Sequence, residues 1–459
     1  DFKRLLESKS CPIIATFRRP EDGGRWKGTE DERQMLVRQA VVAGFDYVDL
    51  EDDVAAKIRR FGKVKRIVSY HNFKEVPDDL EKRYEEMCKL DPDVVKIAVT
   101  PQRVGDNLRV LRLLKDAPKP TVVLCMGDLG VCTRILNVKF GAPFTYAAFN
   151  PERTLAPGMI TYKECKSNYR VETISPKTAI FGVVGDPVGH SLSPLIHNGA
   201  YKHAGLDARY LPFRVPRGDL GAFVKAYQEI PVRGYSVTIP HKEAAAKLAS
   251  WRDPAVEKTG SANTLVLTTE GLKAYNTDLP AAMQSLETAT TSQDTPVPLK
   301  DRTVLILGAG GVARTIAFGL LAAGTQVVVT NRTLDRAQKL AAEVGCRFVD
   351  WAARHGVVCD TLINCTSVGM HPNVDESPIH NSFLKPGLLV FDTIYTPETT
   401  MLLREAAERS CSILTGVDMF VRQAAMQFRL FTGQEPPLDV MTQLVRRALS
   451  PVNYAKEEG

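Results

Sequence analysis

The chain has 459 residues, of which 44% are hydrophobic and 24% charged, a balance typical of globular proteins with a hydrated surface. Such a length exceeds one ordinary hydrophobic core, so we expect roughly two to four folding units. No apolar run approaches the roughly 20 residues of a membrane helix, and the formal charge of +6 is spread without a basic tail. These features argue against membrane insertion and nucleic-acid binding and favour small anionic metabolites as partners. The oligomeric state stays open.

Nine scattered cysteines form no CxxC pair, so we expect free thiols in a reducing compartment, the cytoplasm or, in a plant, the plastid stroma. The eight histidines do not gather with cysteine or carboxylate at ligand spacing, so no metal site is expected. The first residue is Asp1 rather than Met, and we expect the natural N-terminus to lie upstream.

Short apolar runs alternate with amphipathic stretches over about the first 170 residues. The six runs are PIIATFR, DYVDLE, RIVSYH, VVKIAV, TVVLCMG and FTYAAF. A spacing of roughly 25 residues is typical of βα units whose parallel strands are buried on both faces. Because a (β/α)8 TIM barrel needs more strands than these, we expect two further βα units upstream. An open doubly wound sheet is the alternative.

Two polar stretches divide the chain. CKSNYRVETISPKT and TATTSQDTPVPLKD each precede a new apolar strand. We therefore predict an α/β protein with a barrel domain over 1–173, a second α/β lobe over 178–287 and a nucleotide-binding lobe over 288–417. The helical sequence over 418–459 is expected to pack back and complete the second lobe.

An apolar strand, a glycine turn and a helix follow one another in TVLILGAGGVARTIAFGLLAAG, an order typical of a dinucleotide site. Gly308, Gly310 and Gly311 lack Cβ atoms, so the backbone there can approach a pyrophosphate. The free N–H groups at the start of the helix can bind its charge. A tight structural turn is the alternative.

The next strand distinguishes the two nicotinamide cofactors. QVVVT ends in Asn331, Arg332 and Thr333, without the carboxylate that would bind a ribose 2′-hydroxyl. Arg332 offers a planar fork of donors for a 2′-phosphate. The sequence therefore predicts NADP(H) rather than NAD(H), with a solvated surface arginine as the alternative.

About the last 280 residues resemble shikimate dehydrogenases, because a series of motifs occurs in the order of that family. The motifs are GDPVGHSLSP, GYSVTIPHKEAA, GSANTL, YNTD, GAGGVAR, NRT, NCTSVGM and GVDMFVRQAA. The resemblance implies Lys242 and Asp278 as the catalytic pair. It implies substrate contacts at Ser191, Ser193, Thr238, Asn263, Tyr395 and Gln423. It implies cofactor contacts at the three glycines and at Ala309, Val312, Ala313, Asn331, Arg332, Thr333, Thr366 and Met419.

The chemistry of ketone reduction explains why a lysine and an aspartate would form the catalytic pair, Lys242 and Asp278. Hydride transfer creates an alkoxide, which a lysine ammonium can stabilise and protonate. Asp278 would hold the amine and favour its charged form. Ser191 and Ser193, two apart in an extended segment, would point to one side and share a carboxylate. Capping of the following helix is the alternative for the two serines.

About the first 170 residues resemble type I 3-dehydroquinate dehydratases through TFRRPEDGG, SYHNF, VVKIAV, TRILNVKFGAPFTYAA and LAPG. Lys96 lies in an apolar strand, where burial lowers the pKa of an amine and makes it a nucleophile. The resemblance implies an imine at Lys96, proton transfer by His71, and substrate binding by Arg18 and Arg134 near the C-terminal strand ends. A lysine that reaches solvent and a core histidine are the alternatives.

Some positions depart from these patterns. Leu155 and Met159 stand where the dehydratase family has serine and glutamine, Asp22 stands where it has glutamate, and YNTD continues with Leu279 rather than glycine. The sequence predicts a bifunctional enzyme that dehydrates 3-dehydroquinate to 3-dehydroshikimate and reduces this with NADPH to shikimate. The alternatives are a dehydrogenase alone, acting on shikimate or quinate, and a non-catalytic regulator that senses these acids.

Overall fold

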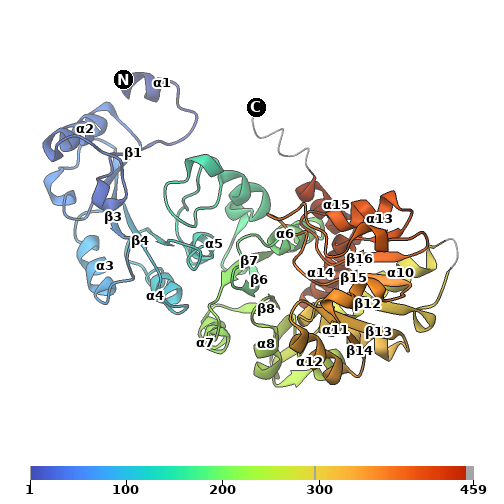
Figure 1. Cartoon of the computed structure of the whole chain (residues 1–459). Coiled ribbons are helices and arrows are strands. Elements are labelled where there is room, and N and C mark those ends of the chain that lie inside the picture. Colours follow the sequence, from blue (N-terminus) through green and yellow to red (C-terminus); the bar gives the residue numbers. More distant parts are fainter. Residues whose placement is uncertain (1, 294–295, 451–459) are drawn as a thin grey trace. The chain divides into compact units, whose positions relative to one another are not determined.

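The computed structural model describes residues 2–293 and 296–450 (Figure 1). It divides into two compact units, the first mainly from residues before 181 and the second mainly from residues after 231, with 181–231 divided between them. Three largely parallel sheets with intervening helices carry the described residues, so the predicted α/β class is confirmed. Among the described residues, no helix combines the length and apolar character that crossing a bilayer requires.

The N-terminal sheet has five parallel strands in the order β1-β2-β3-β4-β5. The strands are β1 (Ile14–Thr16), β2 (Tyr47–Glu51), β3 (Lys65–Asn72), β4 (Val94–Val99) and β5 (Thr121–Cys125). The helices are α1 (Phe2–Glu7), α2 (Glu30–Ala43), α3 (Leu80–Cys88), α4 (Asp106–Arg112) and α5 (Thr133–Lys139). Every residue of β4 and β5 is buried, because both faces of these apolar strands are covered.

The apolar run at 144–149 does not form the sixth strand that its composition predicts. Only Ala148 in this run pairs as a strand would, in a single parallel bridge to Thr161. The bridge rests on two bonds, from Ala148 N–H to Ile160 O (2.9 Å) and from Tyr162 N–H to Ala148 O (2.7 Å). Phe149 is 76% exposed, so the run leaves the core one residue later. Closure of the sheet into a barrel stays a prediction.

The second sheet is mixed, in the order β7-β6-β8-β10-β11-β9, with β10 antiparallel to both of its neighbours. Its strands are β6 (Ala179–Gly185), β7 (Ala208–Arg214), β8 (Val232–Val237), β9 (Trp251–Arg252), β10 (Thr264–Thr268) and β11 (Gly271–Tyr275). Its helices are α6 (Ser193–His203), α7 (Leu220–Ala226), α8 (Lys242–Leu248), α9 (Pro254–Thr259) and α10 (Asp278–Thr291). The antiparallel pair at β10 brings the start of this strand beside the end of β11, just before α10.

The third sheet is parallel throughout, in the order β14-β13-β12-β15-β16-β17. Its strands are β12 (Thr303–Leu307), β13 (Gln326–Asn331), β14 (Arg347–Asp350), β15 (Thr361–Asn364), β16 (Leu389–Asp392) and β17 (Ser412–Leu414). Its helices are α11 (Gly311–Ala322), α12 (Leu334–Val344) and α13 (Met401–Glu408). The strand order reverses between β12 and β15, which is where doubly wound sheets bind nucleotides.

Two amphipathic helices end the described chain: α14 (Gly416–Thr432) and α15 (Leu438–Leu449). Helix α14 packs on α10, β8 and β10, and α15 packs on α6 and α14. The polar stretch predicted to separate the lobes begins inside α10, because Thr290 is buried against the core and holds the helix to Thr291. Residues 294–295 of that stretch and the end of the predicted final segment, 451–459, lie outside the described residues.

Replacing Ile306 by alanine should lower the free energy of unfolding of the second unit by about 2–5 kcal/mol, because it leaves a cavity in a packed core. Ile306 lies in β12 and is fully buried among residues of α10, α11 and β16. Urea unfolding followed by circular dichroism measures the loss. Ile413→Ala, at a position 42% exposed in the same sheet, is the control and should change the unfolding free energy by less than about 1 kcal/mol.

Candidate active sites

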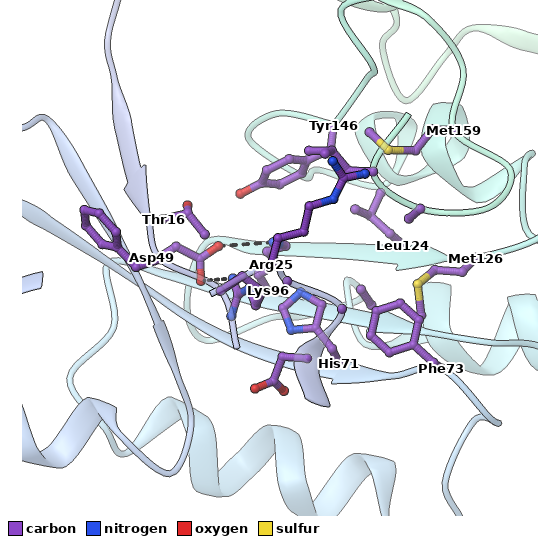
Figure 2. Close-up of a pocket in the computed structure, with 18 of the residues that line it drawn as sticks. Thr16, Arg25, Asp49, His71, Phe73, Lys96, Leu124, Met126, Tyr146 and Met159 are labelled. Carbon is purple, nitrogen blue, oxygen red and sulfur yellow. Dashed lines mark hydrogen bonds and ion pairs between the residues drawn. The ribbon is translucent and has the colours of Figure 1, made fainter. Parts of the chain in front are cut away.

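A cavity of about 540 Å³ lies at the first sheet and is lined by charged and apolar side chains (Figure 2). Lys96 of β4, His71 of β3 and Asp49 of β2 face it from neighbouring strands. The parallel register pairs Ser69 with Lys96 and His71 with Ala98, so His71 and Lys96 point to the same face two positions apart. The structure therefore brings the predicted lysine and histidine to one cavity.

Lys96 is held beside a carboxylate although it is almost buried. Its Nζ donates to Asp49 Oδ2 at 3.1 Å and lies 4.5 Å from the centre of the Tyr146 ring. Burial lowers the pKa of Lys96 below its usual value, while the charge of Asp49 raises it and that of Arg18 lowers it. The net direction is downward, so the neutral amine that a nucleophile needs is easier to reach than in water.

Asp49 organises the cations of this cavity. Its Oδ1 lies 2.7 Å from Arg18 Nη2 and accepts a hydrogen bond from the Ser69 hydroxyl at 2.6 Å. Arg18 also donates to Glu51 at 2.8 Å. Despite burial, the pKa of Asp49 is depressed far below its usual range, because the charges of Lys96 and Arg18 stabilise its anion. Arg18, predicted to bind substrate, is thus already engaged by two carboxylates of the protein.

Sequence reasoning missed Asp49 and Glu51. The signal was present, because DYVDLE places two acids two residues apart in an otherwise apolar strand, so both point to one face. Both are buried, at 3% and 2% exposure. Buried carboxylates in such a strand need cationic partners, which is what Arg18, Lys96 and the buried Arg33 provide.

His71 and Arg134 have unsatisfied donors or acceptors that point to a ligand. His71 Nδ1 and Arg134 Nε have no hydrogen-bond partner within the described part of the chain. Burial, with the nearby charges of Lys96 and Arg18, lowers the pKa of His71 to about 2, so its imidazole is neutral at physiological pH. Burial lowers the pKa of Arg134 to about 10, which leaves its guanidinium charged. A neutral base and a cation thus line the cavity.

Arg134 lies beyond the end of β5, in the helix that follows it. It is the second residue of α5, and its side chain still lines the cavity. The cavity wall also carries Leu155 and Met159 of the loop that departs from the dehydratase pattern, and Leu155 is 74% exposed. Asp22 lies at the same cavity and accepts a hydrogen bond from Arg19 at 2.7 Å.

In the second unit, Lys242 and Asp278 meet as an ion pair. Lys242 begins α8 and Asp278 begins α10, and Lys242 Nζ lies 2.6 Å from Asp278 Oδ2. Asn263 Nδ2 donates to the other carboxylate oxygen at 2.9 Å and lies 3.5 Å from Gln423 Oε1. The structure therefore brings together four of the predicted dehydrogenase residues, from α8, α10, α14 and the position just before β10.

The two serines do not lie in an extended segment. Ser193 is the first residue of α6, and Leu192 between the serines has helical dihedral angles, so the alternation that would align their hydroxyls is absent. Ser191 Oγ instead accepts the N–H of Ser193 at 3.2 Å. Thr238 follows β8, and its N–H donates to Val184 O at 2.9 Å. Tyr395 stacks on Phe420 of α14 with ring centres 4.7 Å apart.

The glycine turn after β12 fits a dinucleotide. Gly308 has φ of +112°, and a Cβ there would meet Cys365 O at 2.9 Å, so only glycine suits the position. A Cβ at Gly310 or Gly311 would meet open space, so packing within the described protein does not require those glycines. Helix α11 starts there without a side-chain cap, which leaves N–H groups for an anion.

The other predicted cofactor residues lie around this turn or at the neighbouring strand ends. Asn331 ends β13, and its side chain donates to Thr333 O at 2.9 Å, which shapes the loop carrying the exposed Arg332. Thr366 bonds Asn364 Oδ1 at 2.7 Å, after β15. Met419 and Ala313 are buried in the core cluster that Val312 and Ala309 border. Within the described residues, no group of three or more possible metal ligands gathers.

Gly308→Ala should weaken NADPH binding at least about tenfold, because alanine is strained at this φ and its Cβ would push the turn away from Cys365. Fluorescence titration with NADPH measures the affinity. Gly345→Ala is the matched control, since Gly345 has φ of +81° at the end of α12 with nothing near its Cβ position. Equal losses in the two variants would contradict a cofactor role for the turn.

Family models match segments of both units. A type I 3-dehydroquinase model matches residues 2–176. A shikimate dehydrogenase substrate binding domain matches 183–265, a shikimate/quinate 5-dehydrogenase model 289–371, and a shikimate 5'-dehydrogenase C-terminal domain 416–446.

Individual relatives cover one or both units. A Methanosarcina mazei shikimate dehydrogenase (NADP(+)) is 41% identical over 59% of this chain and 98% of its own. A Thermus thermophilus shikimate 5-dehydrogenase, solved with NADP(H) and shikimate, is 35% identical with a TM-score of 0.54 and covers 59% of this chain and 100% of its own. The chloroplastic bifunctional 3-dehydroquinate dehydratase/shikimate dehydrogenase of Arabidopsis thaliana is 36% identical over 97% of this chain and 77% of its own. The chain therefore belongs to the family of bifunctional 3-dehydroquinate dehydratase/shikimate dehydrogenases.

Proposed function

We propose that this chain dehydrates 3-dehydroquinate to 3-dehydroshikimate at the first site and reduces that product to shikimate at the second. The observation that carries the proposal is that each site holds a lysine amine against a carboxylate, at 3.1 Å for Lys96 and 2.6 Å for Lys242. The first amine is buried with a lowered pKa and the second is half-buried at the start of a helix. Two amines in different surroundings suit two different reactions.

At the first site, Lys96 attacks the substrate ketone and loses water to form an imine. The imine withdraws electrons from the neighbouring carbon, so a proton there becomes acidic. His71 takes that proton, which its neutral state allows, because burial holds its pKa at about 2 in the free protein. The same imidazole then returns the proton to the departing hydroxyl, which leaves as water, and hydrolysis of the imine frees Lys96.

The charged neighbours orient the acid substrate and the amine. Arg134, whose Nε has no partner in the described structure, is free to bind the substrate carboxylate. Arg18 acts through Asp49 and Glu51, holding the carboxylate that positions Lys96. Leu155 and Met159 supply apolar contacts at the mouth rather than hydrogen bonds.

At the second site, NADPH supplies the hydride, bound with its pyrophosphate at the glycine turn and its 2′-phosphate near Arg332. Lys242 donates a proton to the oxygen that gains negative charge, and Asp278 holds the amine in place. Gln423 approaches Asn263 from α14, and Tyr395 packs on the same helix through Phe420. These residues, with Ser191, Ser193 and Thr238, hold the carboxylate and hydroxyl groups of the ring.

Borohydride should trap 3-dehydroquinate covalently on Lys96 of the full chain, because reduction fixes an imine to its amine. Peptide mass spectrometry locates the adduct. Lys96→Arg should abolish trapping and lower dehydratase kcat by about a thousandfold or more, while dehydrogenase activity stays within about twofold. Lys65→Arg, an exposed lysine at the start of β3, is the matched control and should behave as the parent protein. An adduct on another lysine would rule out the assignment.

Asp49→Asn should move the acid limb of imine formation to lower pH. Asp49 favours the ammonium form and so raises the pKa of Lys96; without its charge that pKa falls further, and the neutral amine persists at lower pH. Reductive trapping with cyanoborohydride across pH measures the limb. A shift to higher pH would contradict the role given to Asp49, and Asp22→Asn, at the same cavity but without an ion pair to Lys96, is the control.

A further inference from the structure

A buried glutamine of α14 lies behind the second site. Gln427 is one helical turn after Gln423 and only 2% exposed. Its Oε1 accepts the Ser236 hydroxyl at 2.6 Å, and its Nε2 donates to Thr264 Oγ1 at 3.1 Å and to Asn263 O at 3.3 Å. The oxygen of the amide therefore bonds to β8, and its nitrogen bonds to the start of β10.

The hydrogen bonds continue from Gln427 to the ion pair. Thr264 Oγ1 donates to Asn263 Oδ1 at 2.9 Å, and Asn263 Nδ2 donates to Asp278 Oδ1 at 2.9 Å. Asp278 Oδ2 accepts from Lys242 at 2.6 Å. An unbroken series of bonds thus links α14 to the amine of Lys242.

The direction of each bond follows from the one before it. The Thr264 hydroxyl accepts from Gln427 Nε2 with one lone pair and donates its single proton to Asn263 Oδ1. The N–H of Thr277 donates to the same oxygen at 2.8 Å. The Thr277 hydroxyl lies 3.3 Å from it as a third donor, so the Asn263 amide turns its N–H groups to Thr277 Oγ1 and Asp278. A flipped amide would set its oxygen against the Asp278 carboxylate.

We infer that Gln427 is a positioning residue of the dehydrogenase, which acts through Thr264 and Asn263 to hold the Asp278 carboxylate in the geometry that orients Lys242. The inference rests on the proposed function, in which Lys242 and Asp278 handle the proton. Asp278 needs two donors at once, one on each oxygen, to keep Oδ2 aimed at Lys242. Asn263 supplies the one on Oδ1, and Gln427 keeps it facing that way.

A merely structural role for Gln427 has a different consequence. As an anchor of α14 on the sheet, it would change the stability of the second unit and leave the turnover of folded enzyme alone. As a positioning residue, it changes kcat because a misdirected proton donor slows the chemical step, whereas the affinity for NADPH depends on the separate glycine turn. The split between kcat and KM therefore distinguishes the two roles.

The experiment uses the full chain with Thr264→Val and Gln427→Met, singly and together, assayed for shikimate oxidation. Each single variant should lower kcat about tenfold, as expected for one lost buried hydrogen bond, with KM for NADP within about twofold. Because both act through one series of bonds, the double variant should be no worse than either single variant. Thr264→Ser, which keeps the hydroxyl, should retain near-parent kcat. Thr432→Val is the matched control on α14, since that hydroxyl donates to Phe428 O and accepts the N–H of Gln434 just after the helix, and neither partner belongs to the series.

Several outcomes would overturn the inference. These are unchanged kcat in both single variants, a Thr264→Ser as slow as Thr264→Val, or multiplicative losses in the double variant. NADP binding reports folding of the second unit, and if Thr264→Val fails that test, Gln427→Asn, whose amide is one carbon short, carries the same expectation. Lys242→Met and Asp278→Asn test the proposed function separately. If they keep full activity, that proposal fails. If they are inactive and the Gln427 and Thr264 variants leave kcat unchanged, only the inference fails.

Discussion

The burial of a lysine amine beside a carboxylate is the interaction on which the rest of this structure depends. In the first unit, desolvation lowers the pKa of Lys96, and Asp49 opposes that shift while fixing where the amine points. A buried charge of this kind is stable only with further partners, which explains why Arg18 and Ser69 contact Asp49 and why Glu51 pairs with Arg18. The network of the first cavity is therefore a condition for keeping one reactive amine out of water.

The second unit also places a lysine amine beside a carboxylate, but this amine is less buried. Lys242 stays partly accessible at a helix start, and the Asn263 amide donates to the carboxylate that pairs with it. The difference fits the two chemistries, since a nucleophile must lose its proton and a proton donor must keep one. The chain thus places the same functional group in two different environments, which differ in burial and in the partners they supply.

Much of this arrangement could be predicted from the sequence, because it depends on local patterns. The apolar run around Lys96 and the glycine turn at Gly308 each carry their chemistry within a few residues, and both lie where their patterns predict. The run at 144–149 has the composition of a strand but lacks a continuous pairing partner, and strand pairing is a property of the whole sheet. Ser193 begins a helix, and its N–H bonds the Ser191 hydroxyl in a local turn. Such a turn competes with the extended conformation, and the spacing of the two serines in the sequence does not show which conformation forms.

Contacts between segments far apart in the sequence were the hardest to predict. The bond from Gln427 to Thr264 joins residues 163 apart, and its glutamine looks like any other on an amphipathic helix. The pairing of Asp49 with Lys96 spans 47 residues, although the acid in an apolar strand was a usable signal. Polar residues in apolar surroundings therefore point to a site, while their partners emerge only from the fold.

The central claim is that two amine sites of one chain process the same cyclic acid in succession. The most direct measurement gives the full chain 3-dehydroquinate and NADPH together and follows products by NMR spectroscopy alongside cofactor absorbance. The account predicts that shikimate appears with one NADPH oxidised per molecule formed, after a transient of 3-dehydroshikimate. Persistence of 3-dehydroquinate, or accumulation of 3-dehydroshikimate without NADPH oxidation, would contradict it.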